Sequence, residues 1–223
     1  IDELIAVRAD IAGPIGVTAL ILVLACLIIE LKPFPANGWG LDVYETAPTG
    51  VAAMLSVAVS SGVFFAFLKL SPLFTDQLGV VAWSGGMSFL FSNLIGIKQT
   101  NARRLLGYSS IGQMGLLLMA VALLRQLGAE ASAALVLSGL FINHLFAKAG
   151  LFWIVGILKR RDIDAPVAVT RSPLMIAMLG LFMVAIAGLP PFPGFWAKWE
   201  LVMQLAAARK LGWIALILVG SLL

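Results

Sequence analysis

Seven long stretches of the 223-residue chain contain almost no charged side chains, and this feature constrains the fold more than any other. A membrane-spanning helix needs about 20 apolar residues to cross roughly 30 Å of hydrocarbon. Backbone polar groups must be satisfied locally in lipid, which favours helices, and no alternating ten-residue pattern typical of a barrel is present. The sequence therefore predicts an all-α, polytopic transmembrane helix bundle. The stretches comprise residues 11–29, 46–68, 77–97, 105–124, 131–158, 172–197 and 211–223.

The composition excludes several other classes of protein. Hydrophobic residues make up 61% of the chain and charged residues only 12%, about half the share in a typical soluble domain. A soluble enzyme and a disordered chain are therefore excluded. The single cysteine, Cys26, excludes a disulfide framework and a cysteine-based iron–sulfur or zinc site. The single histidine, His144, excludes a haem held by two histidines of this chain.

The ends of the chain suggest a fragment. The first residue is Ile1 rather than Met, and the last apolar stretch stops at Leu223, too short to span a bilayer. No connection between stretches is long enough for a soluble domain. We therefore expect residues 1–223 to form a single membrane domain, cut at both ends.

The positive charges favour one orientation in the membrane. The net charge of +4 lies mostly between apolar stretches, which indicates membrane topology rather than nucleic-acid binding. One side carries seven basic residues and the other five, so the first side is expected in the cytoplasm. The first set is Lys98, Arg103, Arg104, Lys159, Arg160, Arg161 and Arg171; the second is Arg8, Lys69, Arg125, Arg209 and Lys210.

Two proline-rich segments interrupt the apolar pattern. Each contains Pro-Phe-Pro followed closely by Trp, within residues 32–39 and 189–196. Proline removes an amide donor and blocks the helix, so each segment is expected to be unwound. Paired interruptions of this kind indicate transporter architecture with an ion site near the bilayer midplane, although chance recurrence at two helix ends is the alternative. The prolines concerned are Pro33, Pro35, Pro190, Pro191 and Pro193.

Lys148 is the most informative single residue, because uncharged residues flank it deep inside the stretch 131–158. A lysine in hydrocarbon costs several kcal/mol unless it is solvated or paired. We interpret it as a group that loads and releases a proton; the alternative is an early helix end that faces water. His144 lies one turn earlier on the same helix face, where it could pass a proton to Lys148 or serve only as a hydrogen-bonded interior residue.

Three further ionisable residues lie at the interruptions. Lys198 follows the second, either as a buried proton carrier or as a lysine that reaches the interface. Glu30 and Lys32 flank the first, either as a carboxylate and an amine that keep each other charged or as ordinary interface charges.

Three motifs carry a family resemblance. Residues 99–115 (QTNARRLLGYSSIGQMG) closely resemble a signature of the antiporter-like subunits of respiratory complex I. Residues 35–48 and 189–198 are similar to two further stretches of that family, the second being its broken helix with a lysine. The family also includes subunits of membrane-bound hydrogenases and Mrp-type sodium/proton antiporters.

The resemblance implies a fold of about fourteen helices with two inverted repeats, each with one broken helix. The end of the first repeat would occupy about residues 11–70, and most of the second about 77–223. Lys198 matches the lysine of the second broken helix, and Lys148 with His144 matches a central pair. The lysine of the first broken helix falls on Glu30, with Lys32 two residues away. Asn37 and Ser60 stand where the family often has ionisable residues.

The resemblance also implies a function. We expect a proton-translocating subunit of a membrane redox complex, in the NADH:quinone oxidoreductase or hydrogenase class, in a bacterial or archaeal cytoplasmic membrane or an organelle inner membrane. No redox active site or cofactor is expected in this chain; iron–sulfur clusters, flavin or a nickel–iron centre would lie in partner membrane-complex subunits. The alternatives are a sodium/proton antiporter subunit and a structural subunit without conduction.

Overall fold

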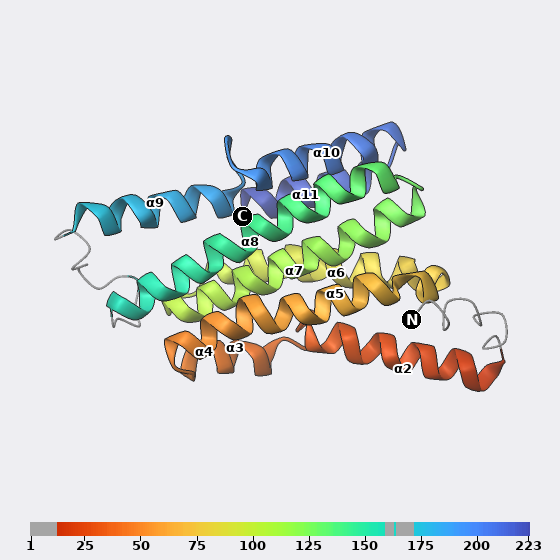
Figure 1. The fold of residues 1–223 in the computed structure, drawn as a ribbon, viewed down its shortest axis with the longest axis horizontal. Coiled ribbons are helices and arrows are strands. Elements are labelled where there is room, and N and C mark those ends of the chain that lie inside the picture. The colour runs from red at the N-terminus through yellow and green to blue at the C-terminus, as the bar shows by residue number, and fades with distance from the viewer. Residues whose placement is uncertain (1–12, 159–162, 164–171) are drawn as a thin grey trace.

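The computed structural model describes residues 13–158, 163 and 172–223, and every regular element in these ranges is a helix. The long helices lie side by side along one direction, as Figure 1 shows. In chain order they are α2 (Pro14–Glu30), α3 (Gly38–Thr46), α4 (Thr49–Met54), the π-helical turn η1 (Leu55–Val59), α5 (Ser60–Leu70), the 3-10 turn η2 (Ser71–Gln77), α6 (Leu78–Gly96), α7 (Ala102–Gln126), α8 (Glu130–Leu158), α9 (Pro173–Ala187), α10 (Pro193–Ala207) and α11 (Leu211–Leu222). The predicted helical bundle is confirmed.

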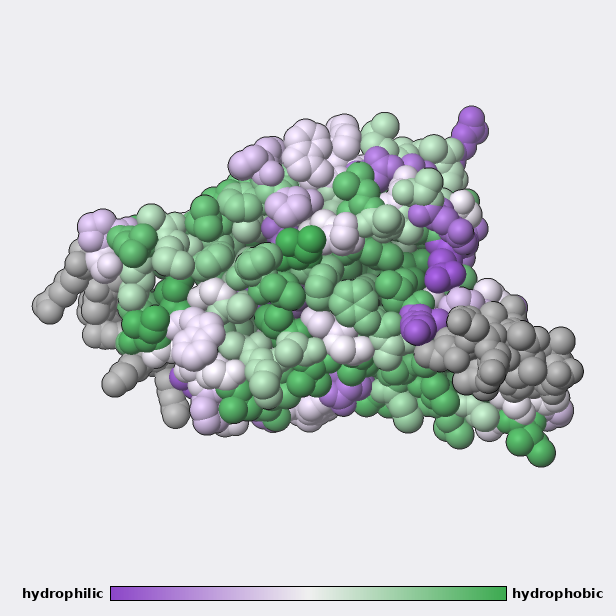
Figure 2. Space-filling model, viewed as in Figure 1, coloured by the Kyte–Doolittle hydropathy of each residue, from purple (hydrophilic) through white to green (hydrophobic). Residues whose placement is uncertain are grey.

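Three continuous helical stretches of the described chain are long and apolar enough to cross a membrane: Thr49–Gly96, Ala102–Gln126 and Glu130–Leu158. The first has 48 residues and folds back on itself at η2, where Phe74 leaves helical geometry. It therefore supplies the two separate passes expected from residues 46–68 and 77–97. Apolar side chains cover most of the face in Figure 2, and polar ones gather towards one end.

Helix α7 forms the centre of the bundle. Every residue from Leu106 to Leu124 is buried except Ser109. The Asn101 side chain accepts hydrogen bonds from the amides of Arg103 and Arg104, so the helix begins with a capped first turn. Helices α3, α5, α6, α8 and α10 pack against this buried helix.

Two apolar clusters lie above and below a polar layer. One cluster gathers the second half of α7 with α5, α6, the start of α8 and α10, and the other gathers the start of α7 with α3, α4 and the end of α8. Buried polar residues lie at the positions between the two sets. They are Ser56, Ser60, Ser110, Gln113, Asn143, His144 and Lys148. The centre of the bundle is therefore polar although both ends of its core are apolar.

Two arginines of α7 hold the short helix α3. Arg104 pairs with the carboxylates of Asp42 and Glu45 at 2.8 and 2.9 Å. Arg103 donates to the backbone oxygen of Ala47 at 3.0 Å. These bonds tie the segment after the first interruption to the start of α7.

Five of the described basic residues lie at two opposite ends of the bundle. Arg103 and Arg104 begin α7, while Lys69 lies at the end of α5, Arg125 at the end of α7 and Lys210 just before α11. The predicted two-sided distribution agrees with these positions. Arg8, Lys159, Arg160, Arg161 and Arg171 lie outside the described residues.

Helices α6 and α7 approach each other through two glycines. A Cβ at Gly85 would lie 2.5 Å from the Gly115 carbonyl oxygen, and a Cβ at Gly115 would lie 2.6 Å from that of Gly85. Both obstacles are backbone atoms, which cannot move without separating the helices. Glycine at these positions therefore sets the distance between α6 and α7.

Gly115→Ala is expected to lower the free energy of unfolding by about 1–3 kcal/mol, because the added methyl pushes α6 away from α7. The thermal unfolding midpoint of the detergent-purified protein measures the effect. Gly62→Ala is the matched control, since Gly62 is exposed on α5 with no atom within 4 Å of its would-be Cβ. Equal midpoints for the two variants would contradict the close packing.

Candidate functional site

Both proline-rich interruptions are unwound, but over fewer residues than the sequence predicts. The first separates α2 from α3 at residues 31–37, and the second separates α9 from α10 at residues 188–192. Pro193 was expected in the unwound segment and instead begins α10, because its fixed φ suits the first turn of a helix. Each segment contains one cis peptide bond, at Phe34–Pro35 and at Pro190–Pro191.

Lys32 lies inside the first interruption and is 3% exposed. Its Nζ lies 5.1 Å from the centre of the Trp39 ring and 5.9 Å from that of Tyr44. Its backbone has a φ of 60°, which costs a non-glycine residue roughly 1–2 kcal/mol. The surrounding structure therefore fixes Lys32 in a position that its own backbone disfavours, as is common at functional sites.

The sequence suggests that Lys32 pairs with the Glu30 carboxylate, but the structure shows a different hydrogen bond. The amine donates to the backbone oxygen of Glu30 at 2.9 Å, and no ion pair joins these two described residues. The reason is the end of α2 at Glu30, which leaves its carbonyl free while its side chain stays half-buried. Lys32 rather than Glu30 is thus the buried ionisable group of this segment.

Lys148 is completely buried in the middle of α8. Its Nζ donates to the backbone oxygen of Leu106 on α7 at 3.4 Å, a long hydrogen bond. Among the described residues it makes no ion pair. The alternative in which Lys148 ends its helix and faces water is wrong, because α8 continues to Leu158.

His144 is also buried, one helical turn before Lys148. Its Nε2 donates to the backbone oxygen of Ser56 at 3.2 Å. A carbonyl oxygen can only accept, so this bond assigns the proton of a neutral ring to Nε2. The Nδ1 atom has no partner among the described residues. It therefore presents an open acceptor in the polar layer.

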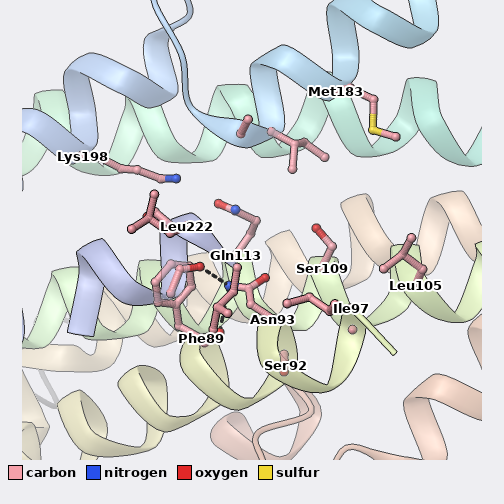
Figure 3. Close-up of a pocket in the computed structure, with 16 residues that line it drawn as sticks. Phe89, Ser92, Asn93, Ile97, Leu105, Ser109, Gln113, Met183, Lys198 and Leu222 are labelled. Atoms are coloured by element: carbon pink, nitrogen blue, oxygen red, sulfur yellow. Dashed lines mark hydrogen bonds between the residues drawn. The ribbon is translucent and has the colours of Figure 1, made fainter. Parts of the chain in front are cut away.

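Lys198 lies in a separate pocket of about 380 Å³ between α6, α7, α9, α10 and α11. Figure 3 shows its amine pointing into the same space as the amide of Gln113. The amine also lies against Gly188, where a Cβ would be 2.9 Å from Nζ. The polar residues around the pocket are Ser92, Asn93, Ser109, Gln113, Lys198 and Ser221. The pocket gives Lys198 a polar environment that could hold water.

Sequence reasoning missed several polar side chains of the layer. The Asn143 amide donates to the backbone oxygen of Ala185 at 2.8 Å and so supports the end of α9 at the second interruption. Ser56 and Ser110 share a buried hydrogen bond of 2.7 Å. The spacing of Ser56 and Ser60, four residues apart in an apolar stretch, is the signal that could have found the first of them.

The structure thus divides the predicted residues into three groups. His144 and Lys148 lie together on α8, Lys32 lies in the first interruption, and Lys198 lies in its own pocket. Glu200, two residues after Lys198, lies outside these groups and accepts hydrogen bonds from Ser132 and Gln204. Helix α7 borders two of the groups, because its Leu106 oxygen accepts from Lys148 and its Ser109 and Gln113 line the pocket of Lys198.

Gly40→Ala is expected to displace Lys32 from its site. A Cβ at Gly40 would lie 2.5 Å from Cδ of Lys32, so the lysine stem must move towards solvent. Modification of Lys32 by an amine-reactive reagent, followed by mass spectrometry, should become markedly faster. Gly38→Ala is the matched control, because nothing lies within 4 Å of its would-be Cβ. An unchanged rate in Gly40→Ala would show that Lys32 is not held there.

Comparison with known proteins places this arrangement in a family. The sequence profile of the NADH:quinone oxidoreductase/Mrp antiporter transmembrane family matches residues 2–223. NADH-quinone oxidoreductase subunit N of Desulforudis audaxviator (strain MP104C) is 29% identical over 95% of the chain and 44% of its own length.

Two solved structures share the fold. A chain of respiratory complex I from Thermus thermophilus with bound aureothin matches 94% of this chain and 47% of its own, with a TM-score of 0.77 and 27% identity. A chain of the Mrp complex from Dietzia sp. DQ12-45-1b matches 95% of this chain and 40% of its own, with a TM-score of 0.83 and 23% identity. The chain spans less than half the length of these relatives. The resemblance seen in residues 99–115 is confirmed, and the chain belongs to the NADH:quinone oxidoreductase/Mrp antiporter transmembrane family, as a stretch of an integral, multi-pass membrane protein.

Proposed function

We propose that this chain is part of an antiporter-like subunit of a membrane-bound redox complex and that it translocates protons. The observation that carries the proposal is Lys148, a fully buried amine without an ion pair among the described residues, in the middle of a long apolar helix. A charge at that depth is costly, so such residues usually mark proton or ion pathways. The family membership supports the same function.

The proton pathway comprises Lys32, His144, Lys148 and Lys198, with Glu30 at its edge. Lys32 belongs to the end of the first repeat, about residues 11–70. The other three residues belong to the second repeat, about residues 77–223. His144 contributes its open Nδ1 acceptor next to Lys148. The first unwound segment lets the Lys32 amine reach the backbone oxygen of Glu30, as discontinuous helices do for ions in transporters.

The driving energy comes from partner subunits. Moving one charge against 100 mV costs about 2.3 kcal/mol. Electron transfer through iron–sulfur clusters, flavin or a nickel–iron centre in those subunits supplies this energy, and this chain contributes the membrane pathway. The relatives support this assignment, since they include an NADH-quinone oxidoreductase subunit and a chain of respiratory complex I.

Lys148→Met is expected to reduce proton pumping to less than half of the wild-type value, because it removes the central proton carrier. Electron transfer and assembly should persist, because methionine is an unbranched side chain that packs well in an apolar interior. The full-length subunit in its native complex is reconstituted into vesicles, and acidification is measured against electron transfer. Lys69→Met is the control, since Lys69 is exposed at the end of α5. Normal pumping in a correctly assembled Lys148→Met complex would contradict the proposal and favour a structural subunit without conduction.

Sodium flux separates the redox-driven pump from a sodium/proton antiporter subunit. The fold is also similar to that of a chain of the Mrp complex, so the two functions have to be distinguished by experiment. In vesicles without an electron donor, the proposed pump exchanges no sodium for protons. Exchange driven by a sodium gradient alone, and lost in Lys198→Met, would move the assignment to ion exchange.

A further inference from the structure

Four hydroxyl groups form a buried cluster, three of them in the polar layer and the fourth, that of Tyr44, in the apolar cluster next to it. Tyr44 comes from α3, Ser56 from η1, Ser60 from α5 and Ser110 from α7, and none is more than 2% exposed. The Tyr44 hydroxyl lies close to the hydroxyls of Ser60 and Ser110. Ser110 and Ser56 share the 2.7 Å bond in which either oxygen can be the donor. The four hydroxyls therefore lie close together in the core, and two of them, Ser56 and Ser110, are directly hydrogen-bonded.

The cluster lies between two of the ionisable groups. On one side, the Lys32 amine is 5.9 Å from the centre of the Tyr44 ring. On the other, the Lys148 amine donates to the backbone oxygen of Leu106, about one turn before Ser110 on α7. The backbone of Ser56 also accepts the Nε2 proton of His144. The hydroxyls thus occupy the space between the first interruption and the central pair on α8.

Hydroxyl groups suit proton transfer for a chemical reason. Each one can accept a proton on a lone pair and release its own proton to the next acceptor. A purely structural role needs only a bond to a nearby backbone oxygen, such as the one Ser71 makes to Leu68 at 2.6 Å. Ser60 also donates to a backbone oxygen, that of Leu55 at 3.0 Å, and its own oxygen keeps its lone pairs as acceptors. The Ser56–Ser110 bond instead joins two groups that can each donate or accept. Such a bond can reverse direction, as a proton relay requires.

We propose that Tyr44, Ser60, Ser110 and Ser56 form a hydroxyl relay that carries protons between Lys32 and the His144–Lys148 pair. The inference rests on the proposed function and deepens it. A proton leaves the Lys32 ammonium, each hydroxyl gains one proton and gives up another, and the last proton bonds to the Lys148 amine or to His144 Nδ1. Single water molecules close the gaps at the two ends. No electrons move, and rotation of the hydroxyls resets the relay.

This relay explains the departure at Ser60. An ionisable residue is absent at that position, where the family resemblance implies one, and a hydroxyl stands there instead. Ser56 lies in the π-helical turn η1, directly before Ser60, and bonds to Ser110 on α7; such turns often occur at functional sites. The first interruption is therefore connected to the centre without a charged side chain between them.

Tyr44→Phe tests the relay, because it removes the hydroxyl and keeps the ring that packs on Phe152. In the full-length native complex reconstituted into vesicles, we expect the ratio of pumped protons to transferred electrons to fall as far as in Lys148→Met. Thermal stability should stay near the wild-type value. Tyr108→Phe on α7 and Ser61→Ala on α5 are the matched controls, and both should keep the wild-type ratio.

A second pair of variants separates a relay from a structural role at Ser110. Ser110→Ala should lower the pumping ratio, and Ser110→Thr, which keeps the hydroxyl, should restore most of it. A wild-type ratio in Tyr44→Phe and Ser110→Ala, together with a loss in Lys148→Met, would overturn the relay and leave the proposed function intact. A wild-type ratio in Lys148→Met would overturn both. A loss in Ser110→Ala that Ser110→Thr does not restore would assign the cluster a packing role only.

Discussion

The Lys148 amine lies between two apolar clusters with the backbone oxygen of Leu106 as its hydrogen-bond acceptor, and this burial of polar groups at mid-depth constrains the rest of the structure. A polar atom in an apolar interior loses several kcal/mol unless it finds a partner. Regular helices use their own backbone groups and offer few such partners. The bundle supplies them by concentrating hydroxyl, amide and amine side chains in one layer, with α7 running through it.

The two interruptions provide space for a lysine side chain in similar ways. In each, a helix stops at the proline-rich segment, a lysine lies in or against the unwound residues, and a glycine leaves room for it. Gly40 accommodates the stem of Lys32, and Gly188 accommodates the amine of Lys198. In both segments the absence of a Cβ therefore makes room for a lysine side chain.

Helix α7 gives neighbouring residues different roles. Ser110 joins the hydroxyl cluster with Ser56, while Ser109 and Gln113 face the pocket of Lys198. Successive helical residues point about 100° apart, so one helix can border both polar compartments. The pathway proposed for this chain therefore depends on the position of α7, which the close approach at Gly85 and Gly115 and the bonds of Arg103 and Arg104 fix.

The sequence by itself determined the membrane-spanning stretches, both interruptions, the family and the shared helix face of His144 and Lys148. These features depend on local composition, on proline chemistry and on helical periodicity, which act over a few residues. Only the tertiary structure decided that Lys32 contacts Trp39 and Tyr44 rather than the Glu30 carboxylate, that Ser56 meets Ser110 across 54 residues, and that Lys198 has its own pocket. Contacts of this kind form between helices, and the packing of small residues that brings those helices together leaves no periodic signal in the chain.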